Sequence, residues 1–168
     1  EHGESLDRTV KYAQTLLSQI VIVDSSSMTG EHGHAVEKLA TAIEAIKEAD
    51  GDAPVVVVDY MQLLETLSAT YSSTDALDKI SRTLCDISHA QKTAVIGIAS
   101  SGKNGTIRGS SQFDSDADIR LSITTDCIHN DGTGEATVHI GKFRDGRSDQ
   151  DVAMKYLPMY HCFTYQNS

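Results

Sequence analysis

The sequence contains no tryptophan, only two prolines and few aromatic residues, and it has no long uninterrupted apolar run. A helix that spans a bilayer needs about 20 consecutive apolar residues, so a membrane-spanning helix is not expected. The first residues also lack the basic start and apolar stretch of a secretory signal. Together with an ordinary hydrophobic content, these absences favour a folded cytoplasmic protein over an exported, membrane-bound or disordered chain.

Cysteine and positive charge are scarce as well. Cys85, Cys127 and Cys162 are widely separated and odd in number, which favours reduced and mostly buried thiols over disulfides. Acidic residues outnumber basic residues by 24 to 14, so the formal net charge is −10. Proteins that hold nucleic acid through a broad surface rely on Lys and Arg, so any such contact should be local. His32 and His34 lack further ligands at supporting spacing, and no metal site is expected there.

Hydrophobic spacing predicts alternating helices and strands in the first hundred residues. Apolar residues at intervals of three and four predict helices within residues 6–19, 36–46 and 77–87. Short runs rich in β-branched and other apolar residues predict strands at 20–23, 55–58 and 94–99. The run 55–58 is apolar at every position, which is typical of a parallel strand covered on both faces. Gly51 is expected to end the second helix, and residues 72–75 form a possible capping box for the third.

The pattern changes beyond residue 100. After a loop rich in Gly and Ser, apolar residues alternate at Ile119, Leu121 and Ile123, which should point inward, and again at Val138 and Ile140. Turn signals at 130–132 and 145–146 predict hairpins, and a last strand is expected over 152–157. The predicted fold class is therefore α/β, with a parallel sheet flanked by helices and antiparallel strands at its C-terminal edge. We expect one domain over residues 1–168.

One acidic residue stands where open parallel sheets bind their ligands. Asp59 directly follows the apolar run 55–58, and ligands of such sheets bind at the carboxyl ends of the strands. A carboxylate there can hold a water of a Mg²⁺ ion that bridges nucleotide phosphates. The alternative is that Asp59 serves only as the cap of a following helix.

Five short segments, in order along the chain, resemble motifs of one protein family. Asp59 opens the sequence DYMQLL, which is similar to the second nucleotide-binding motif of the RecA-like motor domain of DnaB-type replicative DNA helicases. The other matching segments are the run and loop at 20–29, the Gly- and Ser-containing loop with its Asp-Ala-Asp at 107–118, the GKFRDG sequence at 141–146, and the ending at 158–163. The resemblance covers nearly the whole chain and implies a RecA-like P-loop NTPase core.

The resemblance also implies roles for individual residues. Asp59 would bind Mg²⁺ and take part in catalysis, and Ser100 would lie at the nucleotide site, where the family usually carries a Gln. Lys142 and Arg144 would reach the nucleotide site of the neighbouring subunit, as the matching Lys and Arg do in the family. A guanidinium suits that place, because it is planar and permanently charged and can stabilise the charge that builds on a transferred phosphoryl group. The alternative is that Lys142 and Arg144 merely flank a solvated hairpin turn.

A second implied site contacts DNA. Arg108, Gly109 and Ser111 match the strand-contacting positions of the family, and Lys103 resembles a feature of its RepA-like branch. Backbone N–H groups and a single Arg suit phosphate oxygens, which reconciles DNA contact with an acidic chain. The alternative is an exposed loop with no ligand. Asp116 and Asp118, which precede a predicted strand, are expected to be structural.

The sequence departs from the family in the phosphate-binding loop. Residues 100–105 contain a Gly-Lys pair, but they follow the wrong strand and precede no clear helix, so they are not a Walker A motif. The catalytic Glu of the family also has no counterpart, and Glu1 and Glu4 should not inherit its role. We therefore expect residues 1–168 to be part of a longer polypeptide. Taken alone, they would leave a gap in the sheet at the place of the strand that precedes the phosphate-binding loop.

These observations lead to two functional hypotheses of different classes. The first is part of an ATP-driven hexameric replicative DNA helicase from a bacterial cell or a phage-infected host. Its ligands would be ATP, Mg²⁺ and single-stranded DNA, and its partners would be further copies of the chain and possible primase or helicase-loader proteins. The second is a non-catalytic RecA-like module that binds DNA or assembles with a partner ring; another ATPase of the RecA superfamily, such as a recombinase, is a further alternative.

Overall fold

The computed structural model describes residues 2–23, 35–66, 73–100, 112–128 and 132–165. It divides into two compact units, Glu1–His34 and Ala35–Ser168. The organisation as one domain stays a prediction. No helix among the described residues combines the length and the apolar character needed to cross a membrane.

The first unit is built around one helix, α1 (His2–Leu17). It confirms the predicted helix, although it ends two residues earlier than expected. Residues 20–23 were predicted to form a buried strand, and this prediction is wrong for the structure. Ile20, Val21, Ile22 and Val23 are 48–82% exposed and are not in a strand. A strand is defined by hydrogen bonds to a neighbouring strand, and the described part of this unit contains no second strand with which residues 20–23 could pair.

The second unit begins with two helices and a pair of parallel strands. Helix α2 (Lys38–Asp50) ends at Gly51, whose φ of 86° is left-handed and whose N–H donates to the Lys47 carbonyl. Strand β1 (Val56–Val58) pairs in parallel with β2 (Val95–Gly97), and helix α3 (Ser73–Gln91) lies between them in the chain. These elements confirm the predicted alternation. The start of the possible capping box, Ser72, lies outside the described residues.

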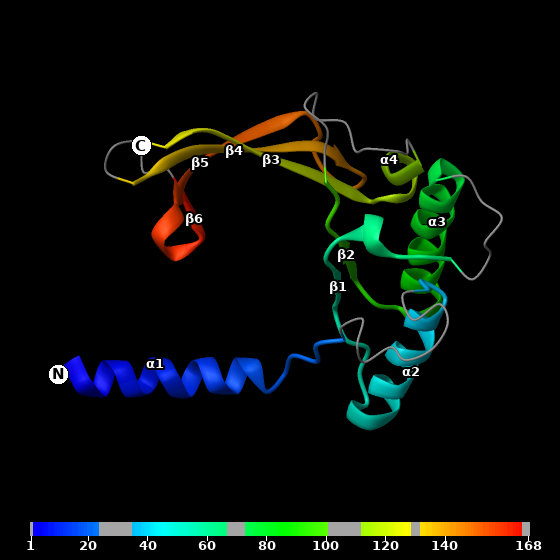
Figure 1. The fold of residues 1–168 in the computed structure, drawn as a ribbon, viewed down its shortest axis with the longest axis horizontal. Coiled ribbons are helices and arrows are strands. Elements are labelled where there is room, and N and C mark those ends of the chain that lie inside the picture. Colours follow the sequence, from blue (N-terminus) through cyan, green and yellow to red (C-terminus); the bar gives the residue numbers. More distant parts are fainter. Residues whose placement is uncertain (1, 24–34, 67–72, 101–111, 129–131, 166–168) are drawn as a thin grey trace. The chain divides into compact units, whose positions relative to one another are not determined.

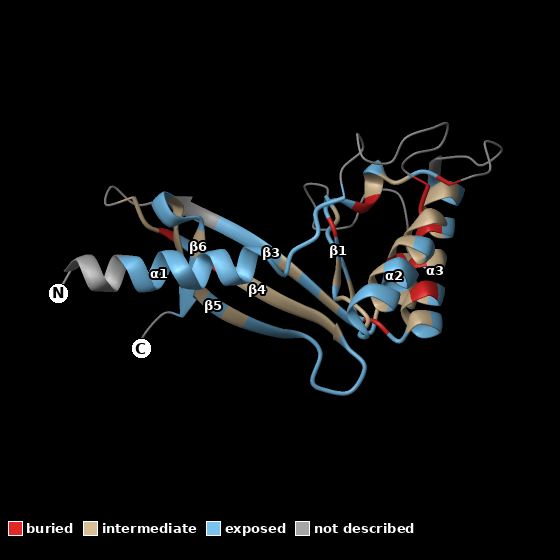
Figure 2. Ribbon diagram, turned by 90° about the horizontal axis from the view of Figure 1, so that it is seen from below, coloured by how far each residue is buried: buried red, intermediate tan, exposed pale blue. Residues whose placement is uncertain are grey.

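The core of this unit lies on one face of the β1–β2 pair, where α2 and α3 are found (Figure 1). Its buried members come from β1, from helices and from the segments that adjoin them, and they are Val36, Val58, Met61, Ile80, Leu84 and Phe113. On the opposite face, Val55, Val57, Ile96 and Ile98 are 44–66% exposed. Figure 2 shows buried positions on β1, α2 and α3 beside exposed ones on the same elements. The prediction that residues 55–58 are covered on both faces is therefore wrong for this structure.

Four antiparallel strands form a second sheet. Strands β3 (Ile119–Ile128), β4 (Gly134–Phe143), β5 (Gln150–Leu157) and β6 (Cys162–Tyr165) are hydrogen-bonded in that order. Between β5 and β6 lies the 3-10 helix η2 (Pro158–Tyr160). Strand β6 was not predicted; its Phe163 ring lies 4.9 Å from that of Tyr156, centroid to centroid.

The apolar face of this sheet is more exposed to solvent than the sequence predicted. Ile119, Leu121 and Ile123 alternate as predicted, and Leu121 and Ile123 register with Ile140 and Val138 of β4. The three residues of β3 were expected to point inward, yet they are 52–57% exposed. Alternation determines that they share a face, but what covers that face depends on another element.

The two sheets are not hydrogen-bonded to each other within the described residues. The sequence predicted one sheet, parallel in its centre and antiparallel at an edge, so this connectivity is a correction. The fold class, α/β, is confirmed.

Replacement of Ile80 by alanine is expected to lower the free energy of unfolding substantially. The Ile80 side chain is 1% exposed and lies in the core cluster on α3. Truncating such a side chain removes its burial and leaves a cavity, at a cost of about 2–5 kcal/mol. Urea unfolding of the complete polypeptide measures the change. Lys79→Ala, the exposed neighbour on the same helix, is the control and should shift stability by less than about 0.5 kcal/mol.

Candidate functional site

The first part of the candidate site is the carboxyl end of β1. Val58 and Met61 are buried, whereas Asp59 and Tyr60 between them are exposed. The Met61 N–H donates to the Ile98 carbonyl at 2.8 Å, and the Ile98 N–H donates to the Val58 carbonyl at 2.9 Å. The chain is therefore anchored on both sides of Asp59, and the carboxylate is presented to solvent at the edge where parallel sheets bind ligands.

The side chain of Met61 explains one requirement of the neighbouring strand. A Cβ placed on Gly97 would overlap the Met61 thioether, so a side chain at position 97 would force the Met61 side chain to move. The 3-10 helix η1 (Met61–Leu63) starts at this anchored methionine. Among the residues that the structure describes, no hydrogen bond or ion pair engages the Asp59 carboxylate, so its oxygens remain available to a ligand.

Gln62 brings Ser100 to the same edge. Its amide nitrogen donates to the Ser100 carbonyl at 3.1 Å, and its amide oxygen accepts from the Ser100 N–H at 3.2 Å. The ends of β1 and β2 are thereby fixed together, with Asp59 and Ser100 on one edge of the sheet. Sequence reasoning assigned no role to Gln62, although it lies within the DYMQLL sequence. A polar residue three positions after Asp59 and amid apolar residues was the available signal.

The second part of the candidate site is organised by a short helix, α4 (Gln112–Asp116). Phe113 is 5% exposed and packs in the core cluster with Ile80 and Leu84 of α3. The Asp116 carboxylate accepts from the Ser81 hydroxyl at 2.6 Å and from the Gln112 amide at 2.7 Å. The Phe113 packing and the Ser81 hydrogen bond attach α4 to α3, and they agree with the structural role predicted for Asp116.

Lys142 contacts α4 itself, and Arg144 contacts Asp118, two residues after the end of that helix. The Lys142 ammonium donates to the carbonyls of Asp114 and Ser115 at 2.7 and 3.1 Å. The Arg144 guanidinium lies 2.5 Å from the Asp118 carboxylate, and the Arg144 N–H donates to the Asp118 carbonyl. The two cations are thus placed by residues 114–118 and are not simply solvated on the hairpin. Asp118, predicted to be structural, is the ion-pair partner of Arg144.

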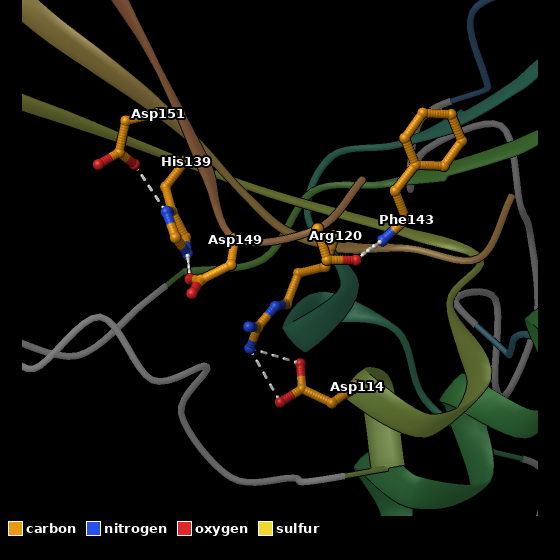
Figure 3. Close-up of polar contacts among 7 residues, drawn as sticks. Asp114, Arg120, His139, Phe143, Asp149 and Asp151 are labelled. Atoms are coloured by element: carbon orange, nitrogen blue, oxygen red, sulfur yellow. Dashed lines mark hydrogen bonds and ion pairs between the residues drawn. The ribbon is translucent and has the colours of Figure 1, made fainter. Parts of the chain in front are cut away.

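Further charged residues gather on the polar face of the antiparallel sheet (Figure 3). Arg120 forms an ion pair with Asp114 at 2.9 Å, and a Cβ on Gly141 would overlap its guanidinium. On β4, His139 Nδ1 lies 2.7 Å from the Asp151 carboxylate, and Nε2 lies 3.8 Å from that of Asp149. Sequence reasoning missed these pairs, because their partners come from different segments of the chain. No three His, Cys, Asp or Glu side chains within the described ranges are arranged to hold a metal ion.

Burial changes the chemistry of the thiol beside α4. Desolvation, together with the nearby carboxylates of Asp116 and Asp86, raises the pKa of the Cys85 thiol above its ordinary value. Cys85 and Cys162 are free thiols, as predicted, but both are half-buried and not buried. The side chain of Cys127 lies outside the described residues.

Cys85 is accordingly expected to alkylate slowly at neutral pH. The thiolate is the reactive form, and a raised pKa keeps the thiol protonated to a higher pH than an ordinary cysteine. The rate of iodoacetamide modification should therefore rise only at more alkaline pH than that of a free cysteine peptide in the same tube. Mass spectrometry of the peptide that contains Cys85 measures it. A rate profile that coincides with the free peptide would contradict this effect of burial.

Several predicted residues cannot be placed. The DNA-binding candidates Lys103, Arg108, Gly109 and Ser111 lie outside the described residues, as do His32 and His34. Of the remaining candidates, the structure brings Asp59 together with Ser100, and it brings Lys142 together with Arg144. The two pairs belong to different sheets, with Asp59 and Ser100 at β1 and β2, and Lys142 and Arg144 at the end of β4.

The chain matches one known family over nearly its whole length and is similar in fold to solved structures. Residues 3–165 match the family described as the DnaB-like helicase C terminal domain. A solved structure described as an ATPase domain is similar, with 24% identity and a TM-score of 0.69 over 80% of this chain and 52% of that chain. A second, described as a DnaB-like replicative helicase and its interactions with primase, has 23% identity and a TM-score of 0.69 over 80% and 36%.

These two similarities, at their level of identity, show the fold. The chain spans about half or less of the length of each of these structures. No curated protein matches the chain significantly.

Proposed function

Because this chain belongs to the DnaB-like helicase C-terminal domain family, we propose that it is part of an ATP-driven hexameric replicative helicase that translocates on single-stranded DNA and unwinds duplex. The observation that carries the proposal is the family match over nearly the whole chain, from residue 3 to residue 165. The placement of Asp59 and of the Lys142–Arg144 pair supports it. Residues 1–168 would then form one partial motor domain that lacks the Walker A segment.

Asp59 is the proposed metal-organising residue. Its carboxylate is exposed, unpaired among the described residues, and located at the carboxyl end of a parallel strand. Hard oxygen ligands of this kind fit Mg²⁺, which takes one or two carboxylates and retains several waters. Bound Mg²⁺ would neutralise charge on the nucleotide phosphates of ATP. Gln62 holds Ser100 at the same edge of the β1–β2 pair as Asp59, so Ser100 is proposed to line the same nucleotide site.

Lys142 and Arg144 are proposed to act on the nucleotide of a neighbouring copy. Both belong to the end of a hairpin, and the Arg144 side chain is 52% exposed, so it is open to an approaching subunit. An Arg presented across an interface stabilises the charge of a phosphoryl-transfer transition state. This role requires more than one copy of the chain, which is the reason for proposing a ring, and a hexamer is the form that the family resemblance implies.

The segment that carries Lys103, Arg108, Gly109 and Ser111 is proposed to contact single-stranded DNA. It connects β2 to α4, so it joins the strand beside the nucleotide edge to the segment that holds Lys142 and Arg144. A contact of one Arg and backbone N–H groups per subunit suits a chain with a net charge of −10. A primase is proposed as a partner because one similar structure is described with its interactions with primase; a helicase loader is a further candidate.

The test is made on the complete polypeptide. Peptide mapping upstream of Glu1 should find a Gly-Lys-Ser or Gly-Lys-Thr loop, and the protein should hydrolyse ATP faster when single-stranded DNA is added. Displacement of a labelled strand from a forked duplex should require ATP and Mg²⁺. DNA binding with neither hydrolysis nor strand displacement would instead support the non-catalytic RecA-like module.

A further inference from the structure

Arg144 is held in the structure by its own chain. Its guanidinium forms an ion pair with Asp118, and both side chains are more than half exposed, at 52% and 61%. The Arg144 N–H also donates to the Asp118 carbonyl at 2.9 Å. The two backbones are therefore fixed beside each other, where β3 begins and β4 ends. Only the flexible Arg144 side chain needs to rotate for the ion pair to open.

The backbone of Asp118 is held in place by the elements on either side of it. It lies between α4 and β3, and α4 is attached to the rest of the unit by Phe113 in the core and by Asp116, which accepts from Ser81. The Ala117 N–H donates to the Phe113 carbonyl, which continues this attachment to the residue next to Asp118. The Asp118 backbone is thus held in place, and its short side chain gives the carboxylate less reach than the long Arg144 side chain gives the guanidinium.

The neighbouring cations are held differently. Lys142 donates to two neutral backbone carbonyls, and Arg120 is paired with Asp114, whose carboxylate accepts two hydrogen bonds at 2.9 Å from one guanidinium nitrogen. Asp114 is therefore engaged elsewhere. Among residues 114–118, all of which the structure describes, Asp118 is the residue whose carboxylate forms an ion pair with the Arg144 guanidinium.

We propose that Asp118 is a positioning residue that restrains Arg144 in the resting subunit and competes for it with the phosphates of the neighbouring copy's nucleotide. This inference rests on the proposed function, in which Arg144 acts across the subunit interface. An exposed ion pair changes an equilibrium by up to about fivefold. That is strong enough to reduce the fraction of free Arg144 and weak enough for a nucleotide phosphate to displace the carboxylate.

The experiment is steady-state ATP hydrolysis by the complete protein without DNA, at saturating ATP. Asp118→Asn keeps the size of the side chain and removes its charge, so kcat is expected to rise by about two- to fivefold. KM for ATP should stay unchanged, because the ion pair restrains a group that acts on the transition state. Asp118→Glu restores the charge and should return kcat toward the wild-type value. An unchanged or lower kcat in Asp118→Asn would overturn the proposal.

A matched variant controls for the loss of one surface charge. Asp151 is also an exposed carboxylate in a single side-chain pair, with His139 of the neighbouring strand β4. Asp151→Asn should leave kcat at the wild-type value, and an equal rise in this variant would overturn the role of Asp118. If Asp118→Asn does not fold, as judged by circular dichroism, Asp118→Ser provides the same comparison.

Two further variants separate this inference from the proposed function. The double variant Asp118→Asn/Arg144→Ala should show no gain over Arg144→Ala alone, because the restraint has nothing to release; a gain would overturn the proposal. Wild-type hydrolysis by Arg144→Ala would contradict the role of Arg144 itself, and with it the basis of the inference. Loss of hydrolysis in Arg144→Ala, with no gain in Asp118→Asn, would contradict the restraint alone.

Discussion

Arg144→Ala is expected to reduce DNA-stimulated ATP hydrolysis by the complete protein on the order of a thousandfold or more, while nucleotide binding is retained. An Arg supplied across an interface contributes about 10³–10⁵ to the rate of phosphoryl transfer, because it stabilises charge that develops only in the transition state. A guanidinium that meets the phosphate mainly in that state contributes little to ground-state affinity. Binding of a fluorescent ATP analogue and steady-state hydrolysis together measure the two effects.

Arg147→Ala is the matched control for this prediction. Arg147 lies in the same turn between β4 and β5 and is exposed, and no role is proposed for it. It should leave hydrolysis close to the wild-type rate. Hydrolysis retained by Arg144→Ala would reject the assignment of Arg144 to the neighbouring site, whereas loss of nucleotide binding in the same variant would indicate a role within its own site.

Asp59→Asn is expected to reduce hydrolysis by roughly a hundredfold or more and to weaken its dependence on Mg²⁺. A bound metal contributes several kcal/mol of charge stabilisation to phosphoryl transfer, and about 1.4 kcal/mol corresponds to a factor of ten. The amide keeps the shape of the carboxylate but not its charge, so the backbone anchored by Met61 should remain in place. Hydrolysis measured against Mg²⁺ concentration provides the readout.

Asp52→Asn is the control for the removal of an acidic side chain near β1. Asp52 is exposed and precedes the strand, at the end away from Asp59. It should leave both the rate and the Mg²⁺ dependence unchanged. A rate for Asp59→Asn within about threefold of wild type would show that Asp59 serves only as the cap of the following helix and does not organise a metal ion.

Mixing the two inactive variants tests their placement in different subunits. If Asp59 acts within its own subunit and Arg144 acts on the neighbour, a ring that contains both variants includes sites with an intact Asp59 and an intact Arg144. Hydrolysis should therefore recover in part when Asp59→Asn and Arg144→Ala are assembled together. A mixture as inactive as the separate variants would argue that both residues serve one site in the same subunit.

The sequence by itself determined the local structure and most of the candidate residues. Apolar spacing predicted α1, α2 and α3, and β-branched runs predicted β1 and β2, because these patterns involve residues close together in the chain. Gly51 was predicted to end α2 for the same reason, since a left-handed residue there depends only on the adjacent helical turn. The family resemblance rested on the same short segments and is confirmed by the family match.

Burial was the quantity that local pattern predicted least well. Apolar residues at every position of 55–58 predicted a strand correctly, but Val57 is exposed while Val58 is buried. The pattern of one segment cannot report whether a second element covers each of its faces. The same limit applies to β3, where the alternation of Ile119, Leu121 and Ile123 identified a shared face without identifying its cover.

Only the tertiary structure decided which polar side chains meet. Gln62 and Ser100 are 38 positions apart, and Asp118 and Arg144 belong to segments joined only when β3 pairs with β4. Hydrogen bonds and ion pairs act over about 3–4 Å, so their partners depend on strand register and helix docking, which arise from long-range packing. The sequence therefore identified Arg144 as a functional candidate, and the fold identified Asp118 as the residue that holds it.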